Sequence, residues 1–418
     1  MVRPTRRAGG LVLGAAILFA VGTNVQAGWV LVLAALLIGA AITGMILPAR
    51  MVRGVGVERR APAEASAGDA VEVDLVVSNR HRRSKLSLLI ADRFIAPATV
   101  FVPVLERLGR SRVTTLRSPA RRGVVEGDPV VVSSSAPFGV ATARRRVPAE
   151  GRTVVFPRVV PIPRLAVLER PARPEPAARP APRRGAGQDF LGTREYRTGD
   201  SLRHIHWPST ARHGTLIVRE FEREEPRKLT ILVDTWADAG IEGPESALDV
   251  ACAAAASATS YALAQGAVVT LAAGLAGVVE VRTRAGRGEA LELLAALRAP
   301  GNVPVDALGE TVDPGDAVLI VAPTWAANAI RLPALCRSLR DLGADVQVVL
   351  VDAAAFGRSQ EAALDPAGAG RMGAEAVSAG AAVARVGHAG RGDEGNEAGA
   401  DLAAALSVPG GAPVGASR

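Results

Sequence analysis

Residues 194–214, REYRTGDSLRHIHWPSTARHG, concentrate side chains that could do chemistry: four arginines, three histidines, two carboxylates, a Tyr and a Trp. Over residues 189–228 there are 8 basic and 7 acidic side chains. Because a phosphate or nucleic-acid site needs an excess of cations, this near balance predicts a network of ion pairs and hydrogen bonds. No nucleic-acid partner is expected.

Two sets of residues could hold a metal. Asp234 ends an apolar run, and the stretch DTWAD places Asp238 four residues later. Hard divalent cations require several converging oxygen ligands, and the sequence offers no further partners, so Asp234 is at most a degenerate site. His204 and His206 have the spacing of a zinc pair on a strand, but on a helix they would diverge. A metal-dependent hydrolase using Asp234, Asp238 and the His204/His206 region is therefore the alternative function.

The usual signatures of catalysis are absent from the sequence. It has no glycine-rich phosphate loop and no nucleophile elbow, so we expect neither nucleotide hydrolysis nor a cofactor. The two cysteines, Cys252 and Cys336, lie in apolar helical settings and are expected to be buried and inert. These patterns favour a protein that is not an enzyme.

Local signals predict how residues 194–214 fold. Gly199-Asp200 is typical of a turn, with Asp200 as the N-cap of a helix over residues 201–207. Pro208 restarts a turn, Gly214 ends it, and a strand follows. Tyr196 and Trp207 either face a partner or fix the segment onto a sheet, and the sequence leaves both open.

The second half of the chain alternates apolar strands and helices. Runs such as KLTILVDT, DAVLIVAP and DVQVVLVD between helical segments predict a doubly wound, mostly parallel α/β sheet over residues 229–355, covered on both faces. From residue 365 the chain is rich in Ala and Gly without clear periodicity, so residues 365–418 are predicted to be a disordered tail.

The preceding segment is predicted to be all β. Residues 71–79, VEVDLVVSN, alternate apolar and acidic positions, and similar short runs continue between turn residues. A β-sandwich of immunoglobulin type over residues 54–165 is the expectation. Residues 170–185 are rich in Pro, Ala and Arg and predict an extended spacer, with contact to anionic lipid as the alternative.

Two apolar runs occupy the first 50 residues. Residues 9–26 and 29–47 are predicted to form a hairpin of transmembrane helices. Arginines flank the pair outside the hairpin and the turn has none, so the positive-inside rule predicts a multi-pass protein of the cell membrane with both termini in the cytoplasm. The alternative is a cleaved signal peptide ending before Gly28.

The central block also carries a resemblance. Residues 186–228 resemble the signature of the domain-of-unknown-function 58 family, in which an Asp usually stands at the position of His206. The matching residues are Phe190, Gly192, Arg194, Glu195, Tyr196, Gly199, Asp200, Arg203, Ile205, Trp207, Ala211, Arg212, Val218, Arg219, Glu220 and Phe221.

The resemblance implies a membrane-anchored protein with a degenerate von Willebrand factor type A domain that works with a MoxR-type AAA+ ATPase in protein assembly or maturation. We therefore expect a cytoplasmic adaptor whose signature residues, with His206 among them, form a partner surface. The AAA+ partner comes from the resemblance alone, and a structural membrane protein without such a partner remains a third reading.

Overall fold

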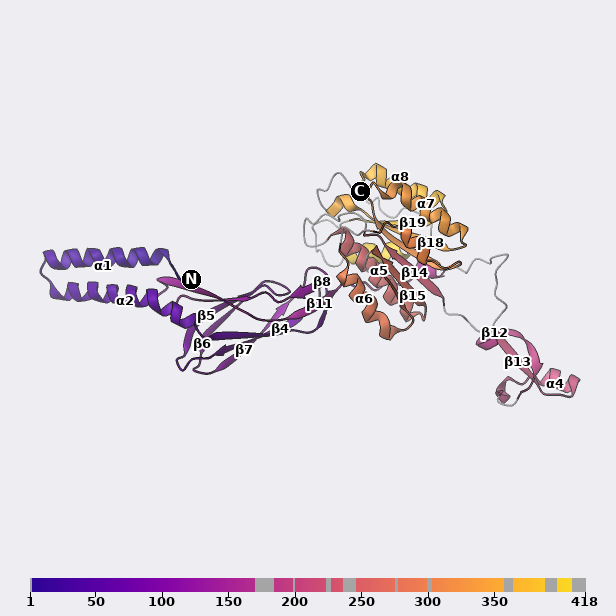
Figure 1. Ribbon diagram of the computed structural model, residues 1–418, viewed down its shortest axis with the longest axis horizontal. Coiled ribbons are helices and arrows are strands. Elements are labelled where there is room, and N and C mark those ends of the chain that lie inside the picture. Colours follow the sequence, from indigo (N-terminus) through magenta and orange to yellow (C-terminus); the bar gives the residue numbers. More distant parts are fainter. Residues whose placement is uncertain are drawn as a thin grey trace. The chain divides into compact units, whose positions relative to one another are not determined.

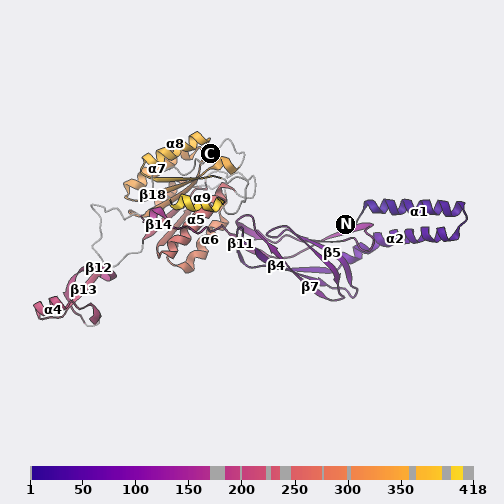
Figure 2. The ribbon, with the colours of Figure 1, turned by 180° about the vertical axis from the view of Figure 1, so that it is seen from behind.

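The computed structural model describes residues 2–169, 184–197, 200–222, 227–235, 246–274, 277–298, 303–356, 364–387 and 397–407. It divides into two compact units, residues 1–158 and 159–418. Figure 1 colours the chain from the N-terminal helices to the C-terminal helix, and Figure 2 shows it from behind. Each unit is described by itself.

Two apolar helices open the first unit. α1 covers Arg6–Asn24 and α2 covers Gly28–Val52, and both are long and apolar enough to cross a membrane. A third helix of sufficient length, Ala247–Ala264, is largely buried in the second unit and is a core element. Residues 25–27 leave room only for a turn, which gives the predicted hairpin.

The end of α2 is part of the β domain. The predicted span stopped at residue 47, but the helix continues to Val52, which is buried in the same core as Leu75 and Leu88. At Gly44 an added Cβ would lie 2.8 Å from the Cβ of Val140, so a glycine is needed where α2 approaches the chain. The helix therefore joins the membrane segment to the β domain without a flexible linker.

The β domain is built from three sheets. Its five-stranded sheet has the order β1-β10-β9-β5-β6, and its three-stranded sheets have the orders β2-β4-β7 and β3-β11-β8. One core joins the first two, since it contains Leu75 of β4 and Ile90 of β5. The strands are β1 Val2–Pro4, β2 Val55–Arg60, β3 Glu64–Ser66, β4 Val71–Asn79, β5 Lys85–Asp92, β6 Ala98–Leu105, β7 Arg110–Arg117, β8 Gly123–Glu126, β9 Val130–Ser134, β10 Ala141–Val147 and β11 Arg152–Phe156.

A buried ion cluster crosses this core. Asp92 accepts hydrogen bonds from Arg59 Nη2 at 2.6 Å and from Arg117 Nη1 at 2.8 Å, and all three side chains are at most 1 % exposed. Burial alone would raise the pKa of Asp92, but the two guanidiniums outweigh it and the pKa lies below its usual value. Arg59 also lies over the ring of Phe94, 4.5 Å from its centroid.

The second unit contains a six-stranded sheet in the order β16-β15-β14-β17-β18-β19. All neighbours are parallel except β16, which runs antiparallel to β15. The predicted mostly parallel sheet is thus present. The strands are β14 Lys228–Val233, β15 Val268–Ala273, β16 Gly277–Val281, β17 Ala317–Pro323, β18 Asp345–Val351 and β19 Ala382–Val386.

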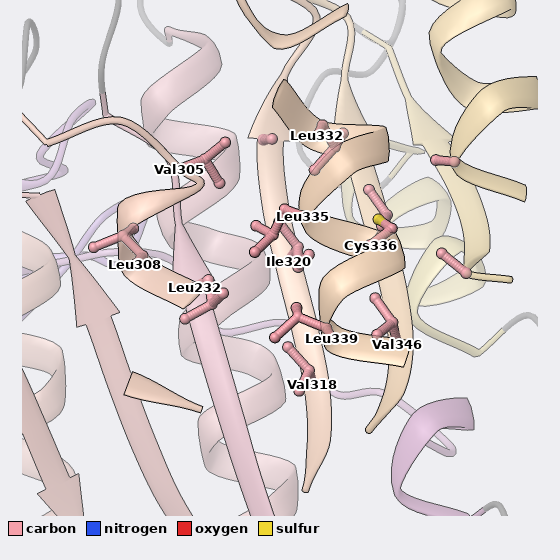
Figure 3. Packing of buried hydrophobic residues seen from close by; sticks show 14 of the residues in the cluster. Leu232, Val305, Leu308, Val318, Ile320, Leu332, Leu335, Cys336, Leu339 and Val346 are labelled. Atoms are coloured by element: carbon pink, nitrogen blue, oxygen red, sulfur yellow. The ribbon is translucent and has the colours of Figure 1, made fainter. Parts of the chain in front are cut away.

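Helices lie on both faces of this sheet, with α7 and α8 on one side and α5 and α6 on the other (Figures 1 and 2). Figure 3 shows Leu335 and Leu339 of α7 packed over Ile320 of β17. The helices are α3 Ala166–Glu169, α5 Ala247–Ala264, α6 Arg287–Ala296, α7 Asn328–Asp341, α8 Pro366–Ser378 and α9 Glu397–Ser407, with 3₁₀ turns η3 Arg284–Gly286, η4 Ala307–Thr311 and η5 Ala353–Phe356.

The prediction of a disordered tail over residues 365–418 is wrong for its described part. α8 begins at an N-cap, where Asp365 Oδ1 accepts from the N–H of Gly368, and β19 pairs with β18. In α9, Leu402, Ala405 and Leu406 are buried. These elements are rich in Ala and Gly, which allows them to pack closely. The same composition is typical of disordered segments, which is why the sequence prediction was wrong.

Residues 159–169 also belong to this unit, although the sequence assigned residues up to 165 to the β domain. The N–H of Val167 donates to Gln347 Oε1 at 3.0 Å, and the amide nitrogen of Gln347 donates to the carbonyls of Ala405 and Leu406. One buried side chain on β18 therefore holds α3 and α9 together. The predicted spacer, residues 170–185, lies outside the described residues except for its last two.

Candidate functional site

The signature residues form a small module of their own. β12 (Arg184–Glu195) pairs antiparallel with β13 (Ile217–Glu222), and between them lie the 3₁₀ turn η1 (Leu202–His204) and the helix α4 (Trp207–His213). Where the structure describes the side chains of this module, Ile205, Ile217 and Val218 are its buried apolar residues, and Ile205 pairs with Val218 in an isolated bridge. We call residues 184–222 the signature module.

An ion pair closes the connection between strand and turn. The guanidinium of Arg194 donates to both oxygens of Asp200, at 2.6 and 2.7 Å, and the N–H of Arg197 donates to the same carboxylate at 2.7 Å. The bond from Arg194 is the main cause that lowers the pKa of Asp200 to about 2. The sequence predicted Asp200 as a helix cap, but it is the acceptor of this ion pair.

The predicted helix over residues 201–207 is also wrong. Only a single 3₁₀ turn forms, with Ser201 at its N-terminus, and Ile205 is extended so that it can join β13. Burial of Ile205 and its pairing with Val218 stabilise the extended conformation, and a helix as short as residues 201–207 is too weak by itself to compete. α4 then begins at Trp207 with Pro208 in its first turn and ends at Gly214, whose φ of +71° explains the glycine.

His206 is the N-cap residue of α4. Its N–H donates to the carbonyl of Ile217, its carbonyl accepts from Ser209 and Thr210, and its Nδ1 lies 2.7 Å from Ser209 Oγ. Asp is among the most favoured residues at such a position, because it accepts backbone hydrogen bonds and opposes the helix dipole. This gives a physical reason for the Asp that the family usually carries there, without an arginine partner.

Other signature residues face solvent. Trp207 is 65 % exposed, and Arg203, Arg212 and Arg219 are exposed as well. Leu202, which is not one of the signature residues, is also 65 % exposed. Both readings of Trp207 were open from the sequence, and its exposure favours a partner-facing role. Large exposed aromatic side chains beside arginines are typical of interaction hot spots.

Several of the remaining signature residues take part in the backbone pairing of the module. The N–H of Tyr196 donates to the carbonyl of Leu216, and Tyr196 is half-buried. Gly192 and Glu195 lie on β12, opposite Glu220 and Ile217 of β13. Phe190 lies on β12 and Glu220 on β13, and Gly199 is outside the described residues.

The predicted metal residue Asp234 lies directly after β14, where the strand order of the sheet reverses between β14 and β17. It is fully buried, and Asn328 Nδ2 donates to its Oδ2 at 2.6 Å. The same nitrogen donates to the carbonyl of Pro323 at 3.1 Å. The carboxylate of Asp234 and the carbonyl of Pro323 can only accept hydrogen bonds, so the atom of Asn328 that faces them must be its amide nitrogen. This nitrogen lies beside the carboxylate, where a cation would need to bind.

The sequence did not single out Asn328. Its signal would have been a polar residue five positions after the end of β17, at the edge where open α/β sheets place their ligands. No group of three or more His, Cys, Asp or Glu that could hold a metal occurs among the residues that the structure describes. Asp238 lies outside them, and His204 and His206 lie in the signature module.

Comparison with known proteins agrees with the signature. Residues 192–352, from β12 to the end of β18, match the family described as "Protein of unknown function DUF58". This match confirms, over that part of the chain, the resemblance seen in the signature residues. No curated protein matches.

Solved structures give only weak likenesses. The CARDB domain of the PF1109 protein from Pyrococcus furiosus is 12% identical, with 24% of this chain and 94% of that chain covered and a TM-score of 0.19. The alkylpurine DNA glycosylase AlkC of Pseudomonas fluorescens is 12% identical, with 34% and 46% covered and a TM-score of 0.16. At such scores neither carries an argument about fold or function.

Proposed function

We propose that this protein is a membrane-anchored adaptor whose signature module docks another protein, with a MoxR-type AAA+ ATPase as the partner. In this proposal both termini lie in the cytoplasm, the β domain is a sandwich of immunoglobulin type, and the second unit is a type A-like body without a working metal site. The ATPase partnership is carried over from the family resemblance.

The observation that supports docking is that the signature module combines an internal ion pair with exposed apolar side chains. The charge of Asp200 is satisfied within the module, because Arg194 and the N–H of Arg197 donate to it. Trp207 and Leu202, by contrast, are both 65 % exposed. A module that needs neither side chain for its own core keeps them available for a partner.

The second unit supports the type A-like part of the proposal. Its strand order runs 3-2-1-4-5-6 when β14 is counted first, which is the order of doubly wound α/β domains. Asp234 lies where the strand order reverses, and the side-chain amide of Asn328 donates a hydrogen bond to its carboxylate. This arrangement supports a type A-like domain that binds no cation at Asp234.

Co-purification from detergent with a MoxR-type ATPase tests the proposal. Trp207→Ala should weaken binding by roughly 30-fold, which corresponds to a hot-spot residue. Alanine is a good helix former, so α4 should persist. Ile330→Ala is the matched control, because Ile330 is 81 % exposed on α7, and it should bind as wild type. Equal binding by all three proteins, or none by any, would contradict the proposal.

Elemental analysis of the same purified protein separates the adaptor from the hydrolase alternative. The adaptor proposal expects no stoichiometric zinc or other divalent metal, because the carboxylate of Asp234 is held by Asn328. One equivalent of metal that is lost in Asp234→Asn would overturn it in favour of the metal-dependent hydrolase.

A further inference from the structure

A cavity of about 490 Å³ lies beside the first strand of the chain. Four arginines line it: Arg3 from β1, and Arg144, Arg145 and Arg146 from β10. Its other lining residues are Pro4, Thr5, Val131 and Thr142, so no acidic side chain is among the described residues that surround it. The cavity therefore gathers positive charge, in contrast to the near-balanced signature module.

The cavity lies at the end of the β domain from which both membrane helices run. β1 ends at Pro4 and α1 begins at Arg6, with Thr5 between them lining the cavity. Thr5 is tied to the chain just before β10, because its N–H donates to the carbonyl of Val140 at 2.9 Å and its Oγ1 to that of Gly139 at 2.6 Å.

The second helix approaches the same place. Val140, directly before β10, packs against Gly44 of α2, where there is no room for a Cβ. Beyond residue 47, Ala49, Met51 and Val52 of α2 pack in the core of the β domain. The lipid-crossing part of the hairpin therefore ends near the start of β10. Arg3 pairs with Thr142, and Arg144 is two residues further along β10, so these long side chains can reach back to the headgroup layer.

The chemistry of the lining selects an anion with oxygen acceptors. Guanidinium groups bind phosphate through paired hydrogen bonds, and four of them line this cavity. At a membrane surface the abundant phosphate is that of the lipid headgroups, and clustered arginines beside a transmembrane helix are drawn to anionic lipid. The cavity is roomy enough for one headgroup.

We propose that the cavity formed by Arg3, Arg144, Arg145 and Arg146 binds the phosphate headgroup of an anionic phospholipid, in the leaflet where α1 begins and α2 ends. The site fixes the β domain against the membrane surface. It does not depend on the adaptor function or on which side of the membrane the domain lies.

The test uses the full-length protein in detergent, with thermal unfolding followed as phosphatidylglycerol or phosphatidylcholine is added. The variant is Arg144→Gln/Arg145→Gln/Arg146→Gln, which leaves Arg3 in place because it precedes α1 and contributes to topology. The control is Arg298→Gln/Arg337→Gln/Arg371→Gln, three exposed arginines of the second unit that change the net charge equally.

Phosphatidylglycerol should stabilise wild type and the control at low lipid concentration, and phosphatidylcholine should not. The β10 variant should need on the order of 100-fold more phosphatidylglycerol, at roughly fivefold per arginine. A β10 variant that responds as wild type would overturn the proposal. So would equal stabilisation by glycerol 3-phosphate or inorganic phosphate at the same concentration, which would indicate a site for a free anion, or stabilisation by a short RNA, which would indicate nucleic acid.

Discussion

Arg194 and Asp200 form the ion pair that holds the signature module closed. The pair is bidentate, and its carboxylate also accepts from the backbone of Arg197. The sequence predicted a charge network here but placed Asp200 on a helix terminus, because a Gly-Asp turn before a polar segment is typical of a helix cap. Arg194 is six residues earlier, near the end of β12, and the path of the turn after that strand brings the two side chains together.

This pair predicts a pH dependence of the module. The pKa of Asp200 is about 2 when folded and near 4 when unfolded, so its contribution to stability is present above pH 4 and is lost as the pH falls through 2. Pepsin cleavage between residues 196 and 216, normalised to an unfolded peptide, should accelerate over this range in wild type. Asp200→Asn should be cleaved rapidly throughout, and equal protection of both proteins at pH 4.5 would contradict the account.

The buried cluster of the β domain predicts a larger effect. Asp92→Asn would leave two guanidiniums buried without a counter-charge, so the free energy of unfolding should fall by roughly 3–5 kcal/mol. Asp74→Asn, on β4 in the other sheet of the same domain, is the control. Its partner Arg112 is exposed, so the loss of stability should be much smaller. Denaturant titration of the detergent-solubilised protein measures both, and equal losses would show that burial of the cluster is not decisive.

At the scale of elements, most strands and helices follow from hydrophobic periodicity. The strand over residues 71–79 and the alternating elements of the α/β sheet are where the pattern predicts them. β1 and the C-terminal elements were not predictable. β1 is three residues long and exists only because it pairs with β10, and α8, β19 and α9 are recognisable only once the sheet edge they complete is known.

Gln347 predicts how the last helix is held. Gln347→Leu keeps the size of the side chain but leaves the N–H of Val167 and the carbonyls of Ala405 and Leu406 without their partner, at a cost of about 1–3 kcal/mol per group. Hydrogen exchange should accelerate in residues 397–407 and 166–169. Gln265→Leu, at the exposed end of α5, is the control, and unchanged exchange in Gln347→Leu would show that α9 is held by its apolar contacts alone.

At the scale of the whole molecule, the chain has an apolar hairpin continuous with a β domain, and a second unit with a doubly wound sheet and the signature module. The match of residues 192–352 to the DUF58 family and the two apolar helices could be predicted from the sequence. The exposure of Trp207 could not, because an isolated aromatic residue in a polar segment is compatible with either a core or an interface.

Site-specific photo-crosslinking in intact membranes tests the docking claim most directly. A photoreactive residue at position 207 should form one major crosslink, identified by mass spectrometry as a MoxR-type AAA+ ATPase, while the same residue at position 330 should not. A crosslink from position 207 only into this chain itself would show that Trp207 packs within the protein, and would contradict the account.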